Sequence, residues 1–491
     1  MRRHHADILP EEPAAARCSV SSIHSRRRMM AWSRKDQIQA NQFLRQRSVS
    51  ALVQAEPDAA HLPSRRPLLG TLAGAIILTL ALAAFGVWGL VRPGAADAWQ
   101  DPGVIIIANE TGTRFVRAAD ERIHPVLNFA SARLIVGADN PKSVHVSARS
   151  LGEAARGLPV GISGAPDALP AAGKLSGGAW TVCSRAAPRP TPVTTVVLGG
   201  EPEGQEPASD TGLLVEDAQK RTYLLADGRR WAIGGSAALA ALNYSATLAL
   251  PVSDGVLNAM PVGPDLRFPP IDNRGKQPRW NAPGGVRVGQ VLQSQVVGTT
   301  TRLMLVLSDG VRTITATEAA LVLGDPAARA SYGASPVRPV PVPASALASA
   351  PTVVEPVDRG AFPVRPPQLL QLLSPQDVAA CAVVQPGEDP VVRLRICAVG
   401  ALAVRRPVPW NGGSLEVAVP PDTGALVRTN VYGGTTYLVT DQARRFAVAD
   451  DAARTALGYG AVRPVDLPPD VIGLVPAGPT LDRAAAAKVQ Q

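Results

Sequence analysis

The feature that most constrains this chain is an apolar run over residues 68–91, which carries no charged side chain and is bracketed by arginines. A helix rises about 1.5 Å per residue and a bilayer core needs about 20 apolar residues, so this run is long enough to cross a membrane. A secretory signal has an apolar region of only about 7–15 residues behind a short leader, whereas more than sixty residues precede this run. The sequence therefore predicts a retained transmembrane helix over 67–91. Cleavage after the A-x-A-like triplet 96–98 is the alternative.

The charges that flank the run predict its orientation. Residues 1–66 hold twelve Lys/Arg against six Asp/Glu, and after Arg92 no basic residue occurs before Arg114. Because basic flanks stay on the cytoplasmic side, we expect a cytoplasmic N-terminus and an extracytoplasmic bulk. Within the run, Gly70 and Gly74 form a GxxxG pattern that can pack transmembrane helices closely, although glycine is also common in such helices without that role.

Ahead of the apolar run, the chain divides into a leader and one helix. Residues 1–32 are rich in Arg, His, Pro and Ala without periodicity, which is typical of a disordered leader. Ser33 and Asp36 form a capping-box pattern, and Pro57 stops the helical segment that follows. We expect a cytoplasmic helix and linker over 33–66, whose weak apolar face needs a partner or the membrane surface.

Beyond the apolar run, the sequence repeats itself. The segment TYLLADGRRWAIGGSAALAALNY (222–244) aligns with TYLVTDQARRFAVADDAARTALGY (436–459), and looser copies occupy 113–137 and 301–325. The first pair shares aromatic positions, matching Tyr223 with Tyr437, Trp231 with Phe446, and Tyr244 with Tyr459. Each copy predicts two strands joined by a turn and then a short helix, with an apolar strand and a proline-rich exit after it. We interpret the shared aromatic residues as core anchors rather than as a ligand-binding set.

These patterns predict an α+β protein whose elongated extracytoplasmic region has four small α/β repeats around a β-rich central domain. A unit of about 60 residues buries little core alone, so the copies are expected to pack together. The predicted segments are repeat 1 (100–170), a first central-domain segment (171–211), repeat 2 (212–270), repeat 3 (285–352), a second central-domain segment (361–423), repeat 4 (424–480) and a tail (481–491).

Three of the four cysteines lie beyond the apolar run, where disulfides persist. Cys183 stands in the first valine-rich central segment, and Cys381 and Cys397 stand in the second. A bond from Cys183 to either partner would tie the two segments into one domain. Cys397 lies in an apolar strand pattern and fits equally well as a buried thiol.

The sequence favours a non-catalytic role. The sequence contains no GxxxxGK[ST] phosphate loop and no HExxH, GxSxG or SxxK motif. Beyond the apolar run there are two histidines, His124 and His145, and no cysteine pair at zinc-binding spacing. We predict no catalytic residue, no metal site and no cofactor. Because no basic stripe interleaves with aromatic residues, the composition argues against nucleic acid as a partner.

Several motifs in order resemble one known family. They are SRKDQIQANQFLRQRSVSALVQAEPD, a single membrane span, TGTRFVRAADERIHPVLNFASARLIVG, LPVGISGAPDALP and WTVCS. This order resembles EccB, the membrane core component of type VII (ESX) secretion systems, over roughly residues 30–480. The extra leader departs from the usual start of the family and favours Met29 or Met30 as the first residue.

The resemblance implies a single-pass scaffold for protein export that associates with itself and with EccC-like ATPase, EccD-like and EccE-like membrane proteins. It also implies a disulfide between Cys183 and Cys381. The family is sometimes described as hydrolysing ATP, for which this sequence has no phosphate loop. An extracytoplasmic hydrolase and a cell-wall-binding anchor remain the alternative functions.

Overall fold

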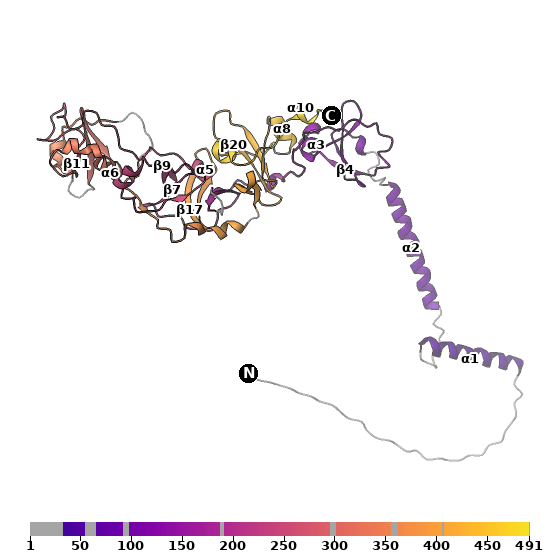
Figure 1. Ribbon diagram of the computed structural model, residues 1–491. Coiled ribbons are helices and arrows are strands. Elements are labelled where there is room, and N and C mark those ends of the chain that lie inside the picture. The colour runs from indigo at the N-terminus through magenta and orange to yellow at the C-terminus, as the bar shows by residue number, and fades with distance from the viewer. Residues whose placement is uncertain are drawn as a thin grey trace, which may run out of the picture. The chain divides into compact units, whose positions relative to one another are not determined.

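A computed structural model describes residues 33–54, 65–91, 98–186, 191–294, 301–354, 362–404 and 407–490 (Figure 1). The predicted leader over 1–32 and most of the linker before the apolar run lie outside these residues. The chain forms two units, residues 1–94 and 95–491, which are described separately below.

The described residues of the first unit form helices α1 (Arg34–Gln54) and α2 (Arg65–Val91). The predicted capping box begins α1: the Ser33 amide donates to the Asp36 carboxylate at 3.1 Å, and the Asp36 amide donates to the Ser33 hydroxyl at 3.3 Å. Within α2, the 19 residues Leu69–Val87 have a mean hydropathy of 2.1 and are long and apolar enough to span a membrane. This confirms the prediction of one apolar helix at that place.

The described portion of the second unit holds five β-sheets, four of which share one strand order. In each of the four, three strands form an antiparallel meander and the fourth pairs in parallel with the first. The strands are β1 (Ile105–Ala108), β2 (Arg114–Arg117), β3 (Ile123–Pro125) and β4 (Ser143–Val146); β7 (Thr211–Glu216), β8 (Thr222–Ala226), β9 (Arg229–Ala232) and β10 (Leu250–Pro251); β11 (Val291–Ser294), β12 (Arg302–Leu307), β13 (Gly310–Ile314) and β14 (Val340–Pro341); β20 (Gly424–Thr429), β21 (Thr436–Thr440), β22 (Arg444–Ala447) and β23 (Val465–Leu467).

A helix connects the third strand to the fourth in each of these sheets. Polar N-caps begin three of these helices, because a side-chain oxygen of Asn128, Thr315 or Asp450 accepts a first-turn amide. The connecting helices are α3 (Phe129–Val136), α4 (Ser236–Ala241), α6 (Ala316–Gly324) and α8 (Asp451–Ala456). The other α-helices of this unit are α5 (Asp254–Asn258), α7 (Arg329–Tyr332), α9 (Pro469–Gly473) and α10 (Arg483–Ala486).

The fifth sheet has six strands in the order β17-β16-β5-β6-β19-β18. All six residues of β6 are buried, as are six consecutive residues of β16, because both faces of this sheet are covered. Strands buried on both faces read as continuous apolar runs, which is why the central segments are rich in valine and alanine. Its strands are β5 (Trp180–Arg185), β6 (Val193–Leu198), β16 (Val378–Gln385), β17 (Val391–Ala398), β18 (Val408–Trp410) and β19 (Leu415–Ala418), and β15 (Gln368–Leu369) pairs with β7 outside this sheet.

The two faces of the central sheet have different covers. One face belongs to a large apolar core that also includes side chains of α5 and α9, among them Val256 and Ile472. The other face carries a small cluster made of the three cysteines with Ala379 and Leu402. Leu402 comes from one of the short 3-10 helices, which are η1 (Ala98–Gln100), η2 (Ala172–Lys174), η3 (Pro326–Ala328), η4 (Ala344–Leu347), η5 (Pro375–Asp377), η6 (Val399–Val404) and η7 (Asn411–Gly413).

Candidate functional site: the disulfide-linked central sheet and its junctions

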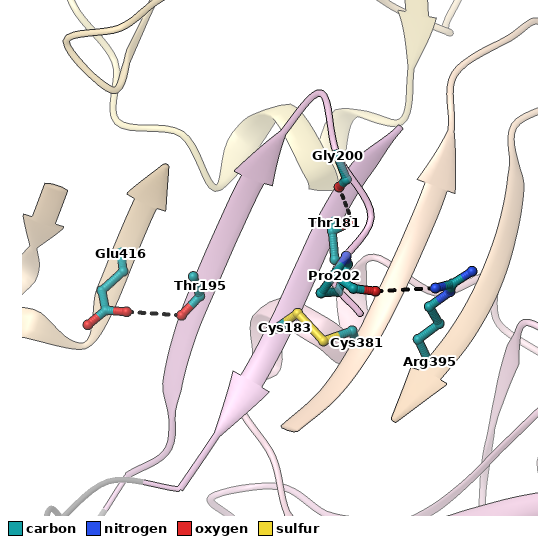
Figure 2. The surroundings of a disulfide bond; sticks show 8 residues. All are labelled: Thr181, Cys183, Thr195, Gly200, Pro202, Cys381, Arg395 and Glu416. Atoms are coloured by element: carbon teal, nitrogen blue, oxygen red, sulfur yellow. Dashed lines mark hydrogen bonds between the residues drawn. A yellow bond between two sulfur atoms is a disulfide. The ribbon is translucent and has the colours of Figure 1, made fainter. Parts of the chain in front are cut away.

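A disulfide joins the two halves of the central sheet. Strands β5 and β16 pair antiparallel with Cys183 directly opposite Cys381, and their Cα atoms lie 4.0 Å apart (Figure 2). The bonded residues are 198 positions apart in sequence. The bond is therefore the one implied by the family resemblance. It covalently links the two segments in which valine-rich strands were predicted.

Polar side chains around the disulfide are hydrogen-bonded (Figure 2). Thr181 donates to the Gly200 carbonyl at 2.9 Å, and Arg395 donates to the Pro202 carbonyl at 3.2 Å. On β19, Glu416 accepts from Thr195 at 3.1 Å and from Arg185 at 2.6 Å. These bonds connect β5, β6 and β19 to one another, and tie β5 and β17 to the segment after β6, through groups that would be costly to leave unpaired.

Cys397 is a buried thiol in the same apolar cluster. It lies on β17 opposite Ala379 and is 2% exposed. A Cβ atom on Gly204 would come within 2.5 Å of its sulfur, so the segment after β6 packs directly over it. Burial raises the pKa of the Cys397 thiol to about 11, which keeps it protonated near neutral pH and unsuited to act as a nucleophile or metal ligand.

Two matching tyrosine contacts join the small sheets to one another. The Tyr244 hydroxyl donates to the Pro367 carbonyl at 2.8 Å, and the Tyr459 hydroxyl donates to the Pro170 carbonyl at 2.7 Å. Both tyrosines are buried, and burial raises the pKa of each above its usual range. Each contact lies shortly before a central strand: Pro170 precedes β5, and Pro367 precedes β15 and β16.

Backbone pairing reinforces both of these contacts. Gln368 and Leu369 of β15 pair in parallel with Thr211 and Gly212 of β7. On the other side, Leu175 forms a parallel bridge with Gly424 at the start of β20. The segment that leads from the first small sheet to β5 therefore pairs first with the fourth small sheet. The segment that leads from the third small sheet to β16 pairs first with the second small sheet.

Connecting helices pack across the same junctions. Helix α4 contacts α6, and a Cβ atom on Gly324 would lie 2.2 Å from that of Ala241, so the helices meet where Gly324 leaves room. Helix α3 contacts both α8 and α10. The Arg133 guanidinium on α3 donates to the Ala456 carbonyl at 3.2 Å, and burial lowers the pKa of Arg133.

The predicted tail over 481–491 is ordered where the structure describes it. Arg483 of α10 donates to the Leu134 carbonyl at 3.2 Å. Val489 forms an antiparallel bridge with Val160, and the backbone N–H of Gln490 donates to the Pro159 carbonyl at 2.9 Å. Figure 1 shows α10, near the end of the chain, beside α3. The end of the chain therefore fastens the first small sheet to the last.

The other residues singled out from sequence take structural places. Trp231, Phe446, Tyr244 and Tyr459 are all buried in apolar clusters, which confirms the interpretation as core anchors. The ring nitrogens of His124 lie 2.8 Å from the Leu158 carbonyl and 3.1 Å from Asp120. A Cβ atom added at Gly70 or Gly74 would have no atom within 4 Å apart from the backbone of its own helix. The packing role of these two glycines therefore stays a prediction.

The described residues contain no group of three or more His, Cys, Asp or Glu that could hold a metal ion. One open hollow of about 420 Å³ is lined by the β20–β21 connection with Glu388, Arg428 and Asp466. Another of about 460 Å³ lies between α3, the segment 169–172 and residues 457–459. No histidine or cysteine stands in either lining.

Comparison with known proteins gives a family match and several full-length relatives. Residues 30–491 match the family described as "Type VII secretion system ESX-1, transport TM domain B". The chain is 29% identical to "ESX-3 secretion system ATPase EccB3" of Mycolicibacterium smegmatis, covering 92% of this chain and 90% of the relative. It is also 29% identical to "ESX-5 secretion system ATPase EccB5" of Mycobacterium tuberculosis, covering 92% of this chain and 93% of the relative.

Solved structures show the same fold. A chain from the intact ESX-5 inner membrane complex superposes with a TM-score of 0.65 at 26% identity, covering 94% of this chain and 97% of that chain. A chain from the EccB3 dimer of the ESX-3 core complex superposes with a TM-score of 0.64 at 26% identity, covering 78% and 99%.

Proposed function

The chain belongs to the EccB family of type VII (ESX) secretion system membrane components, and we propose that it is a single-pass scaffold for protein export. The observation that carries the proposal is the Cys183–Cys381 sheet, which ties distant segments into one framework and contains no assembled catalytic set among the described residues. Such a framework suits a subunit that holds neighbouring subunits in fixed positions.

The four small sheets serve in this proposal as repeated assembly modules. Their common strand order and the matched contacts of Tyr244 and Tyr459 support four copies of one unit around the central sheet. The proposed modules keep the boundaries 100–170, 212–270, 285–352 and 424–480. A module this small buries a limited core alone, so packing between modules supplies the rest.

The proposed orientation places α1 in the cytoplasm and the sheet region outside. The excess of Lys/Arg before α2 favours this direction. A disulfide deep in the sheet region also suits an oxidising compartment. Related chains from an ESX-5 inner membrane complex include one from its periplasmic assembly, which supports the same placement.

We propose as partners a second copy of the chain and the EccC-like ATPase, EccD-like and EccE-like membrane proteins of the same machine. The dimer of a relative supports self-association, and the membrane complex of another relative supports a multi-subunit setting. Gly70 and Gly74 are proposed to pack against another membrane helix, because both leave open backbone surface on α2.

ATP hydrolysis is the competing activity, since the relatives carry the word ATPase in their names. This sequence has no phosphate loop, because Gly173-Lys174 and Gly275-Lys276 lack both the leading glycine and the hydroxyl residue of that motif. In our proposal the ATP-driven step belongs to the EccC-like subunit, and this chain supplies its attachment.

Purification of the tagged chain from native membranes in mild detergent tests the proposal. We expect a large particle that contains an EccC-like ATPase and an EccD-like multi-span protein, identified by mass spectrometry. ATPase activity should follow the EccC-like subunit and disappear when that subunit is removed. A lone chain from cells that express those partners, or ATP hydrolysis by the isolated chain, would contradict the scaffold role.

A further inference from the structure

The connection between β20 and β21 carries the most exposed aromatic side chain in the described residues. Tyr432 is fully exposed, at 109% of its reference area, and its neighbour Val431 is 54% exposed. We call these two residues the 431–432 knob. An aromatic residue held in water at a loop tip forgoes the burial that stabilises most aromatic side chains.

The knob stands on a well-anchored turn. The Gly434 amide donates to the Val431 carbonyl at 2.8 Å, and the Thr429 amide donates to the Thr435 carbonyl at 3.2 Å. Gly433 has a φ of 69°, which places a left-handed residue after Tyr432 as in a type II turn. The Asn430 amide donates to the Leu467 carbonyl at 3.1 Å, which attaches the loop to β23. Such anchoring lowers the entropy that binding would cost.

The corresponding connection in the second small sheet shows that the fold does not require a knob. There, between β7 and β8, Asp217 accepts the amides of Gln219 and Arg221, each at 2.9 Å, and the Tyr223 hydroxyl at 3.2 Å. This turn is closed around a buried carboxylate and bears no exposed large apolar side chain. The knob is therefore an addition to the shared plan.

A polar hollow lies directly beside the knob. It has a volume of about 420 Å³ and is lined by Glu388, Arg428, Thr429, Asn430, Val431, Gly433, Gly434 and Asp466, with Tyr432 projecting outside the lining. Arg428 and Asp466 form a two-pronged ion pair at 2.8 and 3.0 Å, which shapes its wall. The hollow falls within the size range of small-ligand sites, so it has room for one phenol ring. Its carboxylates and backbone carbonyls accept hydrogen bonds from a phenol hydroxyl.

We propose that the 431–432 knob of one copy docks in the hollow of a second copy, and the reverse. An isologous dimer uses the same patch on both subunits, so it needs a projection and a recess side by side, as found here. Tyrosine is among the residues that most often dominate binding energy at interfaces. This inference rests on the proposed self-association and deepens it, since it names the contact surface.

The knob supplies the centre of the interface rather than all of it. A stable dimer buries about 1,200–2,000 Å² in total, which two tyrosine–valine pairs alone do not reach. The surfaces of the fourth small sheet around the hollow complete the contact. Desolvation then falls on the knob and on the hollow wall, where a hot spot is expected.

The test measures self-association of the full-length chain in detergent by sedimentation equilibrium. For Tyr432→Ser we expect the dissociation constant to rise by about 30-fold or more, the size of a hot-spot loss. The dissociation constant of Tyr432→Phe should lie between those of wild type and Tyr432→Ser, since this variant keeps the ring and loses only the hydroxyl. Leu373→Ser is the matched control, because Leu373 is also fully exposed and belongs neither to the β20–β21 connection nor to the lining of the hollow. It should change the constant by less than about twofold.

A photo-crosslinking residue at position 432 gives an independent readout in a mixture of isotopically light and heavy chains. We expect mixed light–heavy cross-links that map to peptides containing Glu388 or Asp466. A wild-type chain that stays monomeric would overturn both this inference and the proposed self-association. A wild-type dimer that Tyr432→Ser leaves intact, or mixed cross-links that map elsewhere, would overturn this inference alone.

Discussion

The hydroxyl of Tyr459 donates a 2.7 Å hydrogen bond to the carbonyl of Pro170, which lies 289 positions earlier in the chain. Tyr244 makes the equivalent bond to Pro367 at 2.8 Å, over 123 positions. Each tyrosine ends one of the two clearest sequence repeats, and each proline lies just before a strand of the central region. The paired contacts show that the end of one small sheet meets the exit of another at both sides of the disulfide-linked sheet.

Removing either tyrosine hydroxyl should therefore loosen one junction. Tyr459→Phe and Tyr244→Phe each leave a buried carbonyl without its donor, which we expect to cost about 1–3 kcal/mol of unfolding free energy. Urea unfolding of the purified chain measures this cost. The control is Tyr437→Phe, because the structure gives the Tyr437 hydroxyl no hydrogen-bond partner among the described residues. Equal stability of Tyr459→Phe and this control would contradict the role assigned to the junction.

The packing of α4 against α6 can be tested by adding a methyl group at their point of contact. Gly324→Ala would place a methyl group 2.2 Å from the Cβ of Ala241, so the two helices must move apart. Overpacking of this kind costs about 1–3 kcal/mol. Gly473→Ala is the matched control, since Gly473 also ends a helix and has no atom within 4 Å of the added methyl. Thermal unfolding should show a lower midpoint for Gly324→Ala only, and a shared midpoint would refute close packing at this site.

The disulfide should contribute strongly to the stability of the sheet region. Replacing both Cys183 and Cys381 by alanine removes a cross-link between residues 198 positions apart, for which we expect a loss of about 2–5 kcal/mol. Cys397→Ala provides the comparison, since it removes a buried sulfur and no cross-link. If the double variant unfolds at the same urea concentration as Cys397→Ala, the disulfide does not hold the halves together.

Features with strong local signals could be predicted from the sequence. The Ser33–Asp36 capping box and the apolar helix need only neighbouring residues, and the alternating and valine-rich strands need only short windows. The apolar strand with a proline-rich exit that was expected after each repeat helix is wrong for residues 469–473, which form α9. Helix α9 is a single short helix that begins after Pro468, and so brief an element leaves no periodic pattern to read.

The junctions and the choice of disulfide partner depend on tertiary structure. Cys381 and Cys397 stand on adjacent strands in one apolar cluster, so local sequence does not separate them as partners for Cys183. The antiparallel register of β5 and β16 decides the pairing. In the same way, no local pattern predicts the contact of Tyr459 with Pro170. No pattern in residues 481–490 predicts that this segment packs on α3.

Cys397, the buried free cysteine of the sheet region, should not react with thiol reagents in the folded chain. Burial raises the pKa of Cys397 to about 11, and thiolate is the reactive form. A thiol reagent at pH 8 should therefore label none of Cys183, Cys381 and Cys397 until the chain unfolds in denaturant. Cys18→Ser removes the other free thiol of the sequence and makes the measurement specific. Rapid labelling of the folded chain would show that Cys397 is accessible and ionised.

Asp217 predicts a defined pH dependence in the second small sheet. Burial opposes ionisation of this carboxyl, but hydrogen bonds from Arg221 and Gln219 outweigh it and hold the pKa of Asp217 below its usual range. Because the folded pKa is lowered, the stabilisation is fully present above the unfolded value of about 3.9 and is lost as the pH falls through the lower folded value.

Asp217→Asn should therefore cost about 1.5–3 kcal/mol at pH 7, since hydrogen bonds to a charged acceptor are replaced by weaker ones. The difference in unfolding free energy between wild type and variant should shrink as the pH falls below about 4, because the Asp217 carboxyl takes up a proton first in the unfolded chain and, at lower pH, in the folded chain as well. Asp101→Asn, at an exposed position, controls for the general effect of losing a carboxylate. If the difference in unfolding free energy between wild type and Asp217→Asn stays constant from pH 7 to pH 3, the charge of Asp217 does not stabilise the turn. The β7–β8 connection would then be closed by its neutral hydrogen bonds alone.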